Sequence, residues 1–265
     1  MTAADEADAA GDVRVERAGP VLTVTLDRPR ARNAQTPATW SALAAIGESL
    51  APDVRIVVLR GEGPSFSAGL DRAMLSPEGI DGMPSLVTLA GMDAEAVDRQ
   101  IADYQRAFTW WSTPEIISVA AVQGHAVGAG FQLALACDLR VVADDARFAM
   151  RETSLGLVPD LTGTSRLVRA VGYARALEIC VTGRWVGAQE AVDIGLAQAV
   201  VPRDQLDAAV ADLVAALTAP DADAVRETKR LLLSAQDLTA GEQRAAERRA
   251  QRRRLVALAE AFRTV

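Results

Sequence analysis

The stretch "AAVQGHAVGAGFQLALACD", Ala120–Asp138, decides the fold. An apolar run typical of a buried strand leads into a turn crowded with glycines, and a helix of small residues follows. Gln132 is the one long polar side chain that faces out of the first helical turn. An amide donates and accepts hydrogen bonds but is no general base near neutral pH. The stretch therefore has the form of a catalytic turn whose base must come from elsewhere.

A second stretch repeats this arrangement earlier in the chain. In "RIVVLRGEGPSFSAGLD", Arg55–Asp71, a continuous apolar strand over 55–61 is followed by a turn of small residues at 67–69. Such a strand is expected in a sheet covered on both faces. Small residues let a ligand approach backbone N–H groups closely, and the start of a helix favours negative charge. Two converging N–H groups would stabilise an enolate. The alternative is that either turn only allows tight strand–helix packing.

The composition bounds the class of protein. The chain has 265 residues, of which 50% are apolar, so it can bury a large core as one domain or a domain with an appendage. The formal net charge of −7 argues against a general nucleic-acid binder. One histidine and two isolated cysteines do not make a standard zinc set, so no metal site is expected. No apolar run reaches membrane-spanning length, and residues 1–11 predict a disordered acidic arm rather than a secretory signal, which favours a cytoplasmic protein.

The remaining elements follow from local patterns. Residues 13–29 predict two strands around a turn, and Thr36 with Pro37 predicts the start of a helix. Residues 71–105 are irregular, and beyond residue 162 the pattern is mostly helical. Further predicted elements are a helix at about 93–111, strands at 116–124 and 139–143, short strands at "RFAMRE" and "AQAVVP", and a last helix from about 240. The sequence therefore predicts an α/β core followed by a helical C-terminal part.

Two familiar motifs fail on their spacing. Gly128 and Gly130 follow a strand, but a dinucleotide fingerprint needs a third glycine at position 133, which is leucine. "GPSFS" at 63–67 lacks the last glycine of a nucleophile elbow, and a serine triad would depend on His125, the single histidine. We therefore take His125 as structural.

In combination, four segments resemble the crotonase superfamily, the enoyl-CoA hydratases and isomerases. They are "LDRPRARNAQT" at 26–36, "FSAGLD" at 66–71, the stretch from Ala120 to Leu167, and "GRWVGAQEAVDIGLAQAVVP" at 183–202. The resemblance covers residues 12 to 240. It implies an α/β fold with a ββα spiral core over 12–200 and a helical trimerisation part over 201–265. Members assemble as trimers or pairs of trimers and act on acyl-CoA thioesters, so coenzyme A is expected as part of the substrate and no separate cofactor.

The resemblance also implies the binding residues. The oxyanion hole of the family corresponds to the backbone N–H groups of Ala68 and Ala129, where alanine at 129 replaces the more usual glycine. Arg30, Ala31 and Arg32 correspond to the path of coenzyme A. The residues expected around the pantetheine and thioester are Ala68, Gly69, Leu70, Asp71, Gly128 and Gln132.

The acid/base positions bear on the reaction. Hydratases of the family use two glutamates to activate one water; the first corresponds to Gln132 and the second to Glu152. A water held by one carboxylate and one amide is poorly activated, because only one group exchanges protons. Isomerases of the family manage with one glutamate at the second position. The resemblance therefore favours double-bond isomerisation with Glu152 as the proton carrier.

Other interpretations stay open at this point. Asp160 lies where a dienoyl-CoA isomerase branch has an acid/base partner, or it serves as a helix N-cap or turn former before the next helix. Gln132 contacts the substrate or caps backbone N–H groups. A weak hydratase is the alternative activity, and a non-catalytic acyl-CoA binder is the alternative of another class. Arginines of the last helix either face solvent or reach a phosphate of coenzyme A: Arg244, Arg248, Arg249, Arg252, Arg253 and Arg254.

Overall fold

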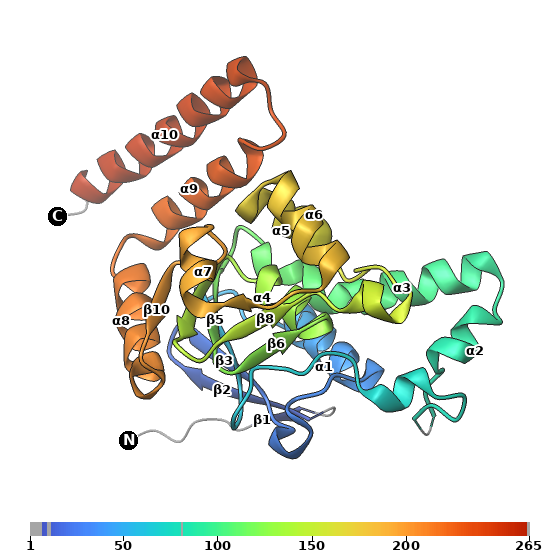
Figure 1. Ribbon diagram of the computed structural model, residues 1–265. Coiled ribbons are helices and arrows are strands. Elements are labelled where there is room, and N and C mark those ends of the chain that lie inside the picture. Colours follow the sequence, from blue (N-terminus) through green and yellow to red (C-terminus); the bar gives the residue numbers. More distant parts are fainter. Residues whose placement is uncertain (1–6, 10–11, 81, 264–265) are drawn as a thin grey trace.

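The computed structural model describes residues 7–9, 12–80 and 82–263, and Figure 1 shows their arrangement. A seven-stranded sheet has the order β1-β2-β3-β4-β5-β7-β10, and a three-stranded sheet has the order β6-β8-β9. The strands are β1 (Ala7–Ala9), β2 (Val13–Ala18), β3 (Val21–Leu26), β4 (Ile56–Gly61), β5 (Ile117–Val122), β6 (His125–Val127), β7 (Leu139–Ala143), β8 (Arg147–Ala149), β9 (Val186–Gly187) and β10 (Ala199–Val201).

The large sheet begins with antiparallel pairs and continues with parallel ones. β2 and β3 form the predicted hairpin, and β3, β4, β5, β7 and β10 then pair in parallel in that order. Each parallel pair needs a crossover, and the intervening turns and helices supply it. The mixed α/β fold and its helical C-terminal part confirm the predicted fold class.

The predicted disordered arm over 1–11 is corrected at three residues. Ala7–Ala9 form β1 and pair antiparallel with β2, with Ala7 opposite Val15 and Ala9 opposite Val13. An edge strand needs only backbone N–H and C=O groups, so a chain without an apolar pattern can still add to a sheet. The other residues of the arm lie outside the described residues.

β4 is buried on both faces, as its apolar run predicts. Val57 and Leu59 belong to the main core, whereas Ile56 and Val58 pack in a second cluster with Leu206 of α8. Alternate side chains of a strand point to opposite faces, so one strand serves two apolar layers. The sheet is therefore an inner layer of the molecule.

The helices pack around the two sheets (Figure 1). Thr36 caps α1, accepting a hydrogen bond from the N–H of Thr39, with Pro37 at the first helical position. This confirms the predicted helix start. The helices are α1 (Pro37–Glu48), α2 (Leu86–Ala90), α3 (Ala94–Thr109), α4 (Ala129–Ala136), α5 (Gly163–Val171), α6 (Tyr173–Thr182), α7 (Ala188–Asp193), α8 (Leu206–Thr218), α9 (Ala222–Ser234) and α10 (Ala240–Arg263).

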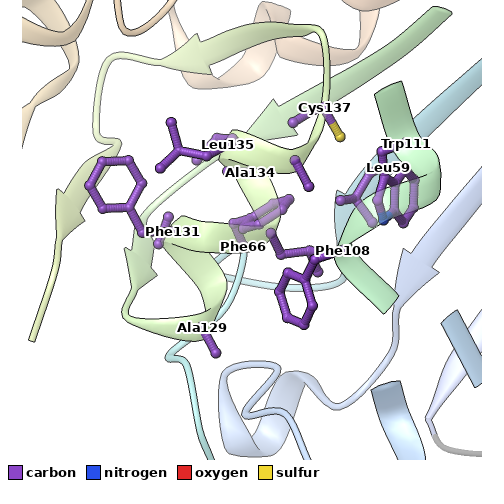
Figure 2. Close-up of a cluster of buried hydrophobic side chains, with 14 of the residues drawn as sticks. Leu59, Phe66, Phe108, Trp111, Ala129, Phe131, Ala134, Leu135 and Cys137 are labelled. Carbon is purple, nitrogen blue, oxygen red and sulfur yellow. The ribbon is translucent and has the colours of Figure 1, made fainter. Parts of the chain in front are cut away.

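α4 runs through the centre of the core, and every one of its residues is buried. Figure 2 shows it surrounded by apolar side chains, among them Phe66, Phe108 and Trp111. Cys137 follows the helix, and burial raises the pKa of its thiol to about 12. This environment fixes where the first turn of α4 lies, and with it the second glycine turn.

A buried cation connects α9 to the core. The Lys229 ammonium of α9 donates to the carbonyl of Ile116 at 2.6 Å and to Oδ2 of Asp138 at 2.7 Å. α10 begins at Ala240, as predicted, and lies along α9 (Figure 1), where Arg253 pairs with Glu227 at 2.8 Å. Desolvation lowers the pKa of Lys229, and the carboxylate of Asp138 opposes that effect.

Candidate active site

The turn after β4 and the segment before α4 are joined by backbone hydrogen bonds. The N–H of Phe66 donates to the carbonyl of Gln123 at 2.8 Å, and the N–H of Ser67 donates to the carbonyl of His125 at 2.9 Å. The carbonyl of Ser67 accepts from the N–H of Val127 at 3.0 Å. Residues 125–127, expected as a turn, therefore form a strand, and the two glycine turns move as one unit.

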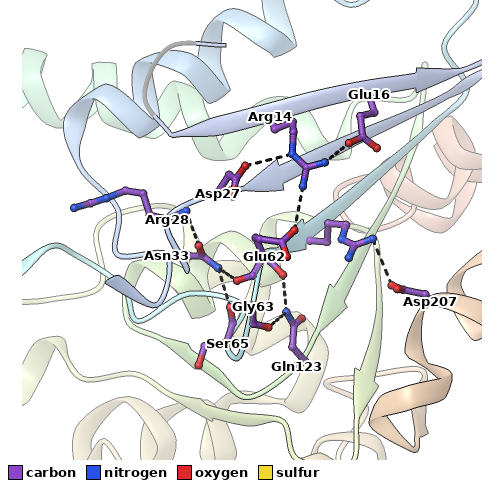
Figure 3. Close-up of polar contacts among 12 residues, drawn as sticks. Arg14, Glu16, Asp27, Arg28, Asn33, Glu62, Gly63, Ser65, Gln123 and Asp207 are labelled. Carbon is purple, nitrogen blue, oxygen red and sulfur yellow. Dashed lines mark hydrogen bonds and ion pairs between the residues drawn. The ribbon is translucent and has the colours of Figure 1, made fainter. Parts of the chain in front are cut away.

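A polar network holds the loop that leads into the first turn (Figure 3). The side-chain amide of Asn33 donates to the carbonyls of Glu62 at 2.9 Å and Ser65 at 2.8 Å. Its oxygen accepts from the N–H of Arg28 at 2.9 Å. Asn33 is 2% exposed, so these bonds are shielded from water. Both polar atoms of the buried Asn33 amide, the oxygen and the nitrogen, therefore form hydrogen bonds that fix the loop.

Ala68 does not offer a free N–H group. That N–H donates to the carbonyl of Arg32 at 2.8 Å. The expectation that Ala68 supplies one half of the oxyanion hole is therefore wrong for this structure. Gly69 lies between Ala68 and Leu70 with a φ of +88°, so the chain turns there and the N–H groups of Ala68 and Leu70 face different surroundings.

Leu70 provides the free N–H group in this turn. Its neighbours both bond to Gln35: the carbonyl of Gly69 accepts at 2.7 Å, and the N–H of Asp71 donates at 2.8 Å. The N–H of Leu70 consequently points away from Gln35, and no partner for it is found in the part of the chain that the structure describes. Leu70 lines the cavity described below.

Gly69 is required at its position. Its φ is +88°, in the region that favours glycine, and an added Cβ would lie 2.4 Å from the carbonyl oxygen of Val127. A Cβ added to Gly69 would also lie 3.6 Å from the backbone nitrogen of Ala129. The absence of a side chain thus brings the first turn against the start of α4.

The second turn leaves the first N–H of α4 free. Gly128 has φ +50° and donates its own N–H to the carbonyl of Ala149 at 2.9 Å. Ala129 begins α4, and within the described residues its N–H has no partner. A helix start carries partial positive charge and suits a developing oxyanion. Ala129 therefore agrees with the sequence-based expectation.

Glu152 places its carboxyl group beside the second turn. It begins a short 3-10 helix, Glu152–Leu155, and a Cβ built on Gly128 would lie 3.3 Å from its Oε1. Oε2 is buried and lacks a hydrogen-bond partner among the described residues. Burial raises the pKa of Glu152, and the nearby charge of Asp160 raises it further. A raised pKa suits a carboxylate that must both accept and return a proton.

Gln132 caps backbone groups and also contacts Glu152. Its Oε1 accepts from the N–H of Leu161 at 2.9 Å and of Gly163 at 3.3 Å, while its Nε2 donates to Oε1 of Glu152 at 2.7 Å. The residue is 0% exposed and does not line the cavity. Of the two interpretations open from sequence, the capping of N–H groups is the one that the contacts show.

Asp160 lies near Glu152 but outside the cavity lining. Its carbonyl accepts from the side-chain amide of Gln105 at 2.6 Å, and burial raises the pKa of its carboxyl group. The N-cap of α5 is Thr162, not Asp160, so the N-cap interpretation is wrong. The contact of Asp160 with the site is electrostatic, because its charge contributes to the raised pKa of Glu152.

A cavity of about 790 Å³ opens over the two turns and Glu152. Most of the predicted binding residues line it, and Arg30 and Gln132 do not. Arg30 is exposed on the adjoining 3-10 helix. The lining residues are Ala31, Arg32, Ala34, Ala68, Gly69, Leu70, Asp71, Arg72, Leu75, His125, Val127, Gly128, Ala129, Arg151, Glu152, Ser154, Leu155, Leu157 and Trp185.

Several lining residues were not found from sequence. Trp185 stands edge-on to His125 with ring centroids 5.4 Å apart, and the guanidinium of Arg151 lies 5.1 Å from the Trp185 ring centroid. Arg72 adds a further positive charge. Arg151 directly precedes Glu152 in the chain, which is a usable signal, whereas Trp185 approaches only through folding. The cavity therefore combines an apolar surface with guanidinium groups suited to phosphate.

Asp71 has a structural role at the cavity edge. Its Oδ1 accepts from the N–H of Ala73 at 3.0 Å, and its Oδ2 pairs with Arg28 at 3.0 Å. Both oxygens are occupied, so Asp71 orients the segment after Leu70 rather than offering a free base.

Two searches of the described residues complete the site. Within residues 7–9, 12–80 and 82–263, no group of three or more His, Cys, Asp and Glu side chains is arranged to bind a metal ion. Over the same ranges, no helix combines the length and apolar character needed to cross a membrane.

Comparison with known proteins gives consistent results. The model of the family described as "Enoyl-CoA hydratase/isomerase" matches residues 16–257. A solved structure of a "putative enoyl-CoA hydratase" from Thermobifida fusca in complex with acetoacetyl-CoA is 48% identical, with a TM-score of 0.90 over 93% of this chain and 96% of that one. The same protein has also been solved in complex with CoA.

More distant relatives carry two kinds of names. The "Probable enoyl-CoA hydratase echA8" of Mycobacterium tuberculosis is 32% identical over 196 residues, which is 73% of this chain and 70% of that protein. The peroxisomal Delta(3,5)-Delta(2,4)-dienoyl-CoA isomerase of Arabidopsis thaliana is 33% identical over 189 residues, which is 71% of this chain and 67% of that protein.

Proposed function

The chain belongs to the enoyl-CoA hydratase/isomerase family and is an enzyme of that family, and from this premise we propose that it shifts the double bond of an enoyl-CoA thioester. One observation carries the proposal. Of the two carboxyl groups that line the cavity, both oxygens of Asp71 are occupied, whereas Glu152 keeps Oε2 unpartnered within the described residues and is bonded to the amide of Gln132. One proton carrier is enough for isomerisation, whereas water activation benefits from two.

Two backbone N–H groups would bind the thioester oxygen. Leu70 and Ala129 are the free donors of the two turns, and Gly69 keeps those turns close. A well-placed donor of this kind stabilises a developing oxyanion by about 3 kcal/mol. Arg32, Arg72 and Arg151 supply positive charge for the phosphates of coenzyme A, the nucleotide part of the substrate. No separate cofactor is needed for this chemistry.

The reaction is a transfer of one proton within the substrate. Oε2 of Glu152 removes a proton from the carbon next to the thioester of a 3-enoyl-CoA, so that a C–H bond breaks and an O–H bond forms. The electron pair moves into a dienolate whose oxygen rests on the two N–H groups. The carboxylic acid then returns its proton to the distal carbon, which leaves the double bond next to the thioester. Asp160 assists by raising the pKa of Glu152.

Hydration is the second candidate, because several relatives are named as hydratases. In that case Glu152 would activate a water that Gln132 only helps to orient. The acyl group is not specified by these contacts. The irregular segment 71–105, with Leu75 at the cavity, is the part best placed to select it.

The test is to offer the purified protein 2-enoyl-, 3-enoyl- and dienoyl-CoA thioesters and to separate the products by chromatography. We expect conversion of 3-enoyl-CoA at an enzymatic rate, on the order of 1 to 1000 per second. Hydration of 2-enoyl-CoA at such a rate, with slower isomerisation, would overturn the preference. Tight binding of acetoacetyl-CoA without turnover of any thioester would instead identify a non-catalytic binder.

The assembly is part of the same proposal: a trimer, or a pair of trimers, formed through the C-terminal helices. The support is that α9 and α10 expose large apolar side chains, namely Leu232, Leu255, Val256, Leu258 and Phe262. Large exposed apolar side chains that gather on two neighbouring helices are typical of an interaction site. Light scattering on the eluted protein measures the mass, and a monomer at micromolar concentration would contradict this assembly.

A further inference from the structure

The side-chain amide of Gln132 has only one possible orientation. Its oxygen faces two backbone N–H groups, those of Leu161 and Gly163, and both can only donate. The nitrogen must therefore face Glu152, where it donates to Oε1 at 2.7 Å. Gln132 is 0% exposed, and a Cβ on Gly163 would lie 2.6 Å from its Cγ, so glycine at 163 makes room for this side chain.

The two oxygens of Glu152 are consequently not equivalent. Oε1 is fixed as an acceptor of the Gln132 N–H. A proton on Oε1 would turn it into a hydroxyl oxygen, which is a weaker acceptor for the Gln132 N–H. Oε2 is buried and has no partner among the described residues. The contact with Gln132 therefore favours Oε2 as the site of any proton that Glu152 carries.

We propose that Gln132 is a positioning residue, which binds Oε1 of Glu152 and thereby reserves Oε2 as the single atom that exchanges protons with the substrate. This inference rests on the proposed function, in which Glu152 is the proton carrier. The inference assigns a second role to the Gln132 amide. Gln132 replaces a second carboxylate, but it also gives the remaining one a fixed orientation and a defined site of protonation.

A second carboxylate at this position would behave differently. It would still accept from the N–H groups of Leu161 and Gly163, but it would face Glu152 as a like charge or share one proton with it. The proton would then occupy the contact between the two residues rather than Oε2. The amide removes this competition and also stabilises the charged form of Glu152.

The deciding variant is Gln132→Glu, because it keeps the side-chain length and both backbone caps and changes only the donor to Glu152. We expect the acidic limb of the pH–rate profile for isomerisation to move up by about 1 to 3 units, the effect of a like charge on a carboxyl pKa. On that limb each unit is about a tenfold loss of rate at fixed pH. KM for the thioester should change less than about twofold, since Gln132 does not line the cavity.

A readout that needs no turnover separates this inference from the proposed function. The carboxyl signal of Glu152, assigned by its loss in Glu152→Gln, can be titrated by infrared difference spectroscopy. We expect its midpoint to rise in Gln132→Glu. Should the wild-type protein turn over no thioester, this titration still decides whether Gln132 controls the ionisation of Glu152.

Two further variants keep the test decisive. Gln132→Met loses both the caps and the donor, so it should lower the melting temperature and also raise the midpoint of Glu152. Gln105→Met is the matched control, because it removes a buried bond to the same segment, at the carbonyl of Asp160, without touching Glu152. An unchanged Glu152 midpoint in a folded Gln132→Glu or Gln132→Met protein would overturn the inference and leave Gln132 as a cap only.

Discussion

Two partly buried carboxylates, Asp138 and Glu152, follow α4 in the chain. The protein supplies hydrogen-bond donors to them in different ways. Asp138 collects several donors at one oxygen: its Oδ2 accepts from the ammonium of Lys229 at 2.7 Å, and from the N–H of Ser118 at 2.8 Å and its hydroxyl at 3.2 Å. Glu152 has one bonded oxygen, Oε1, and one buried oxygen without a partner in the described structure. The first arrangement stabilises a connection between elements, and the second leaves capacity for a reaction.

The physical cost explains why the two differ. A buried charge is tolerated when it is paired and hydrogen-bonded, and an unpaired polar atom costs about 1 to 3 kcal/mol. Asp138 avoids that cost. Glu152 bears this cost at its unpaired oxygen, and burial raises its pKa. Between these two carboxylates, the unpaired oxygen distinguishes the candidate proton carrier, whereas burial alone does not.

Replacing Glu152 should give the largest effect of the comparison. In Glu152→Gln the shape and the contact with Gln132 can persist, but the group no longer exchanges protons. We expect kcat for isomerisation to fall by about 10² to 10⁴-fold, the usual contribution of a general acid–base. Steady-state kinetics with 3-enoyl-CoA measures this, and acetoacetyl-CoA binding checks that the cavity is intact. Isomerisation that survives the change would refute the role of Glu152.

Replacing Lys229 should have the converse effect, on stability rather than on rate. Lys229→Met leaves the Asp138 carboxylate without its cation, and breaking a buried pair costs about 3 kcal/mol or more. We expect the free-energy cost to lie at the lower end of this range, because the Asp138 side chain is 19% exposed. Denaturant unfolding gives the loss directly. Activity per folded molecule should stay within about twofold, and a large loss of kcat without a loss of stability would contradict the division between the two carboxylates.

Replacing Asp160 should give the smallest effect and tests its action through charge. The charge of Asp160 raises the pKa of Glu152, so Asp160→Asn should move the acidic limb of the pH–rate profile to lower pH. The plateau rate should change less than about tenfold, whereas loss of a true acid–base partner would cost about 10² or more. The full pH–rate profile distinguishes the two outcomes.

The same variant has a defined effect on stability. Burial raises the pKa of Asp160, so its contribution to stability is present below the unfolded pKa and is lost as pH rises through the folded pKa. Asp160→Asn has no carboxyl group to ionise at this position, so it does not lose this stability as the pH rises. Its melting temperature relative to wild type should therefore increase from acidic to neutral pH, and a decrease would mean that the buried carboxylate is stabilised by contacts rather than penalised.

The sequence predicted those elements whose causes are local. The apolar run of β4, the Thr36 cap of α1 and the start of α10 each depend on a few neighbouring residues, and all three were confirmed. The position of the free N–H in the first turn depends on pairing with Gln35, across 35 residues of chain, and the prediction of Ala68 was wrong.

Long-range contacts decide the rest of the site. The bonds from Gln132 to Leu161 and Gly163, and to Glu152, join segments 20 to 31 residues apart, so the local pattern around Gln132 showed an amide without showing its partners. Trp185 reaches the cavity from a segment that no local pattern connects to it. The roles that the resemblance implied for Glu152, Asp160 and the binding residues remain predictions for the experiments above.

The hydrogen bonds between the two glycine turns have a consequence for how such an enzyme can change its substrate. Ser67 bonds to both His125 and Val127, so neither turn can be displaced without the other. Mutations that enlarge or reshape the acyl pocket can therefore accumulate in segments outside this unit, such as 71–105 and 153–158, without altering the spacing of the two N–H donors. A chain built in this way can diversify in specificity while the spacing of its two N–H donors is inherited unchanged.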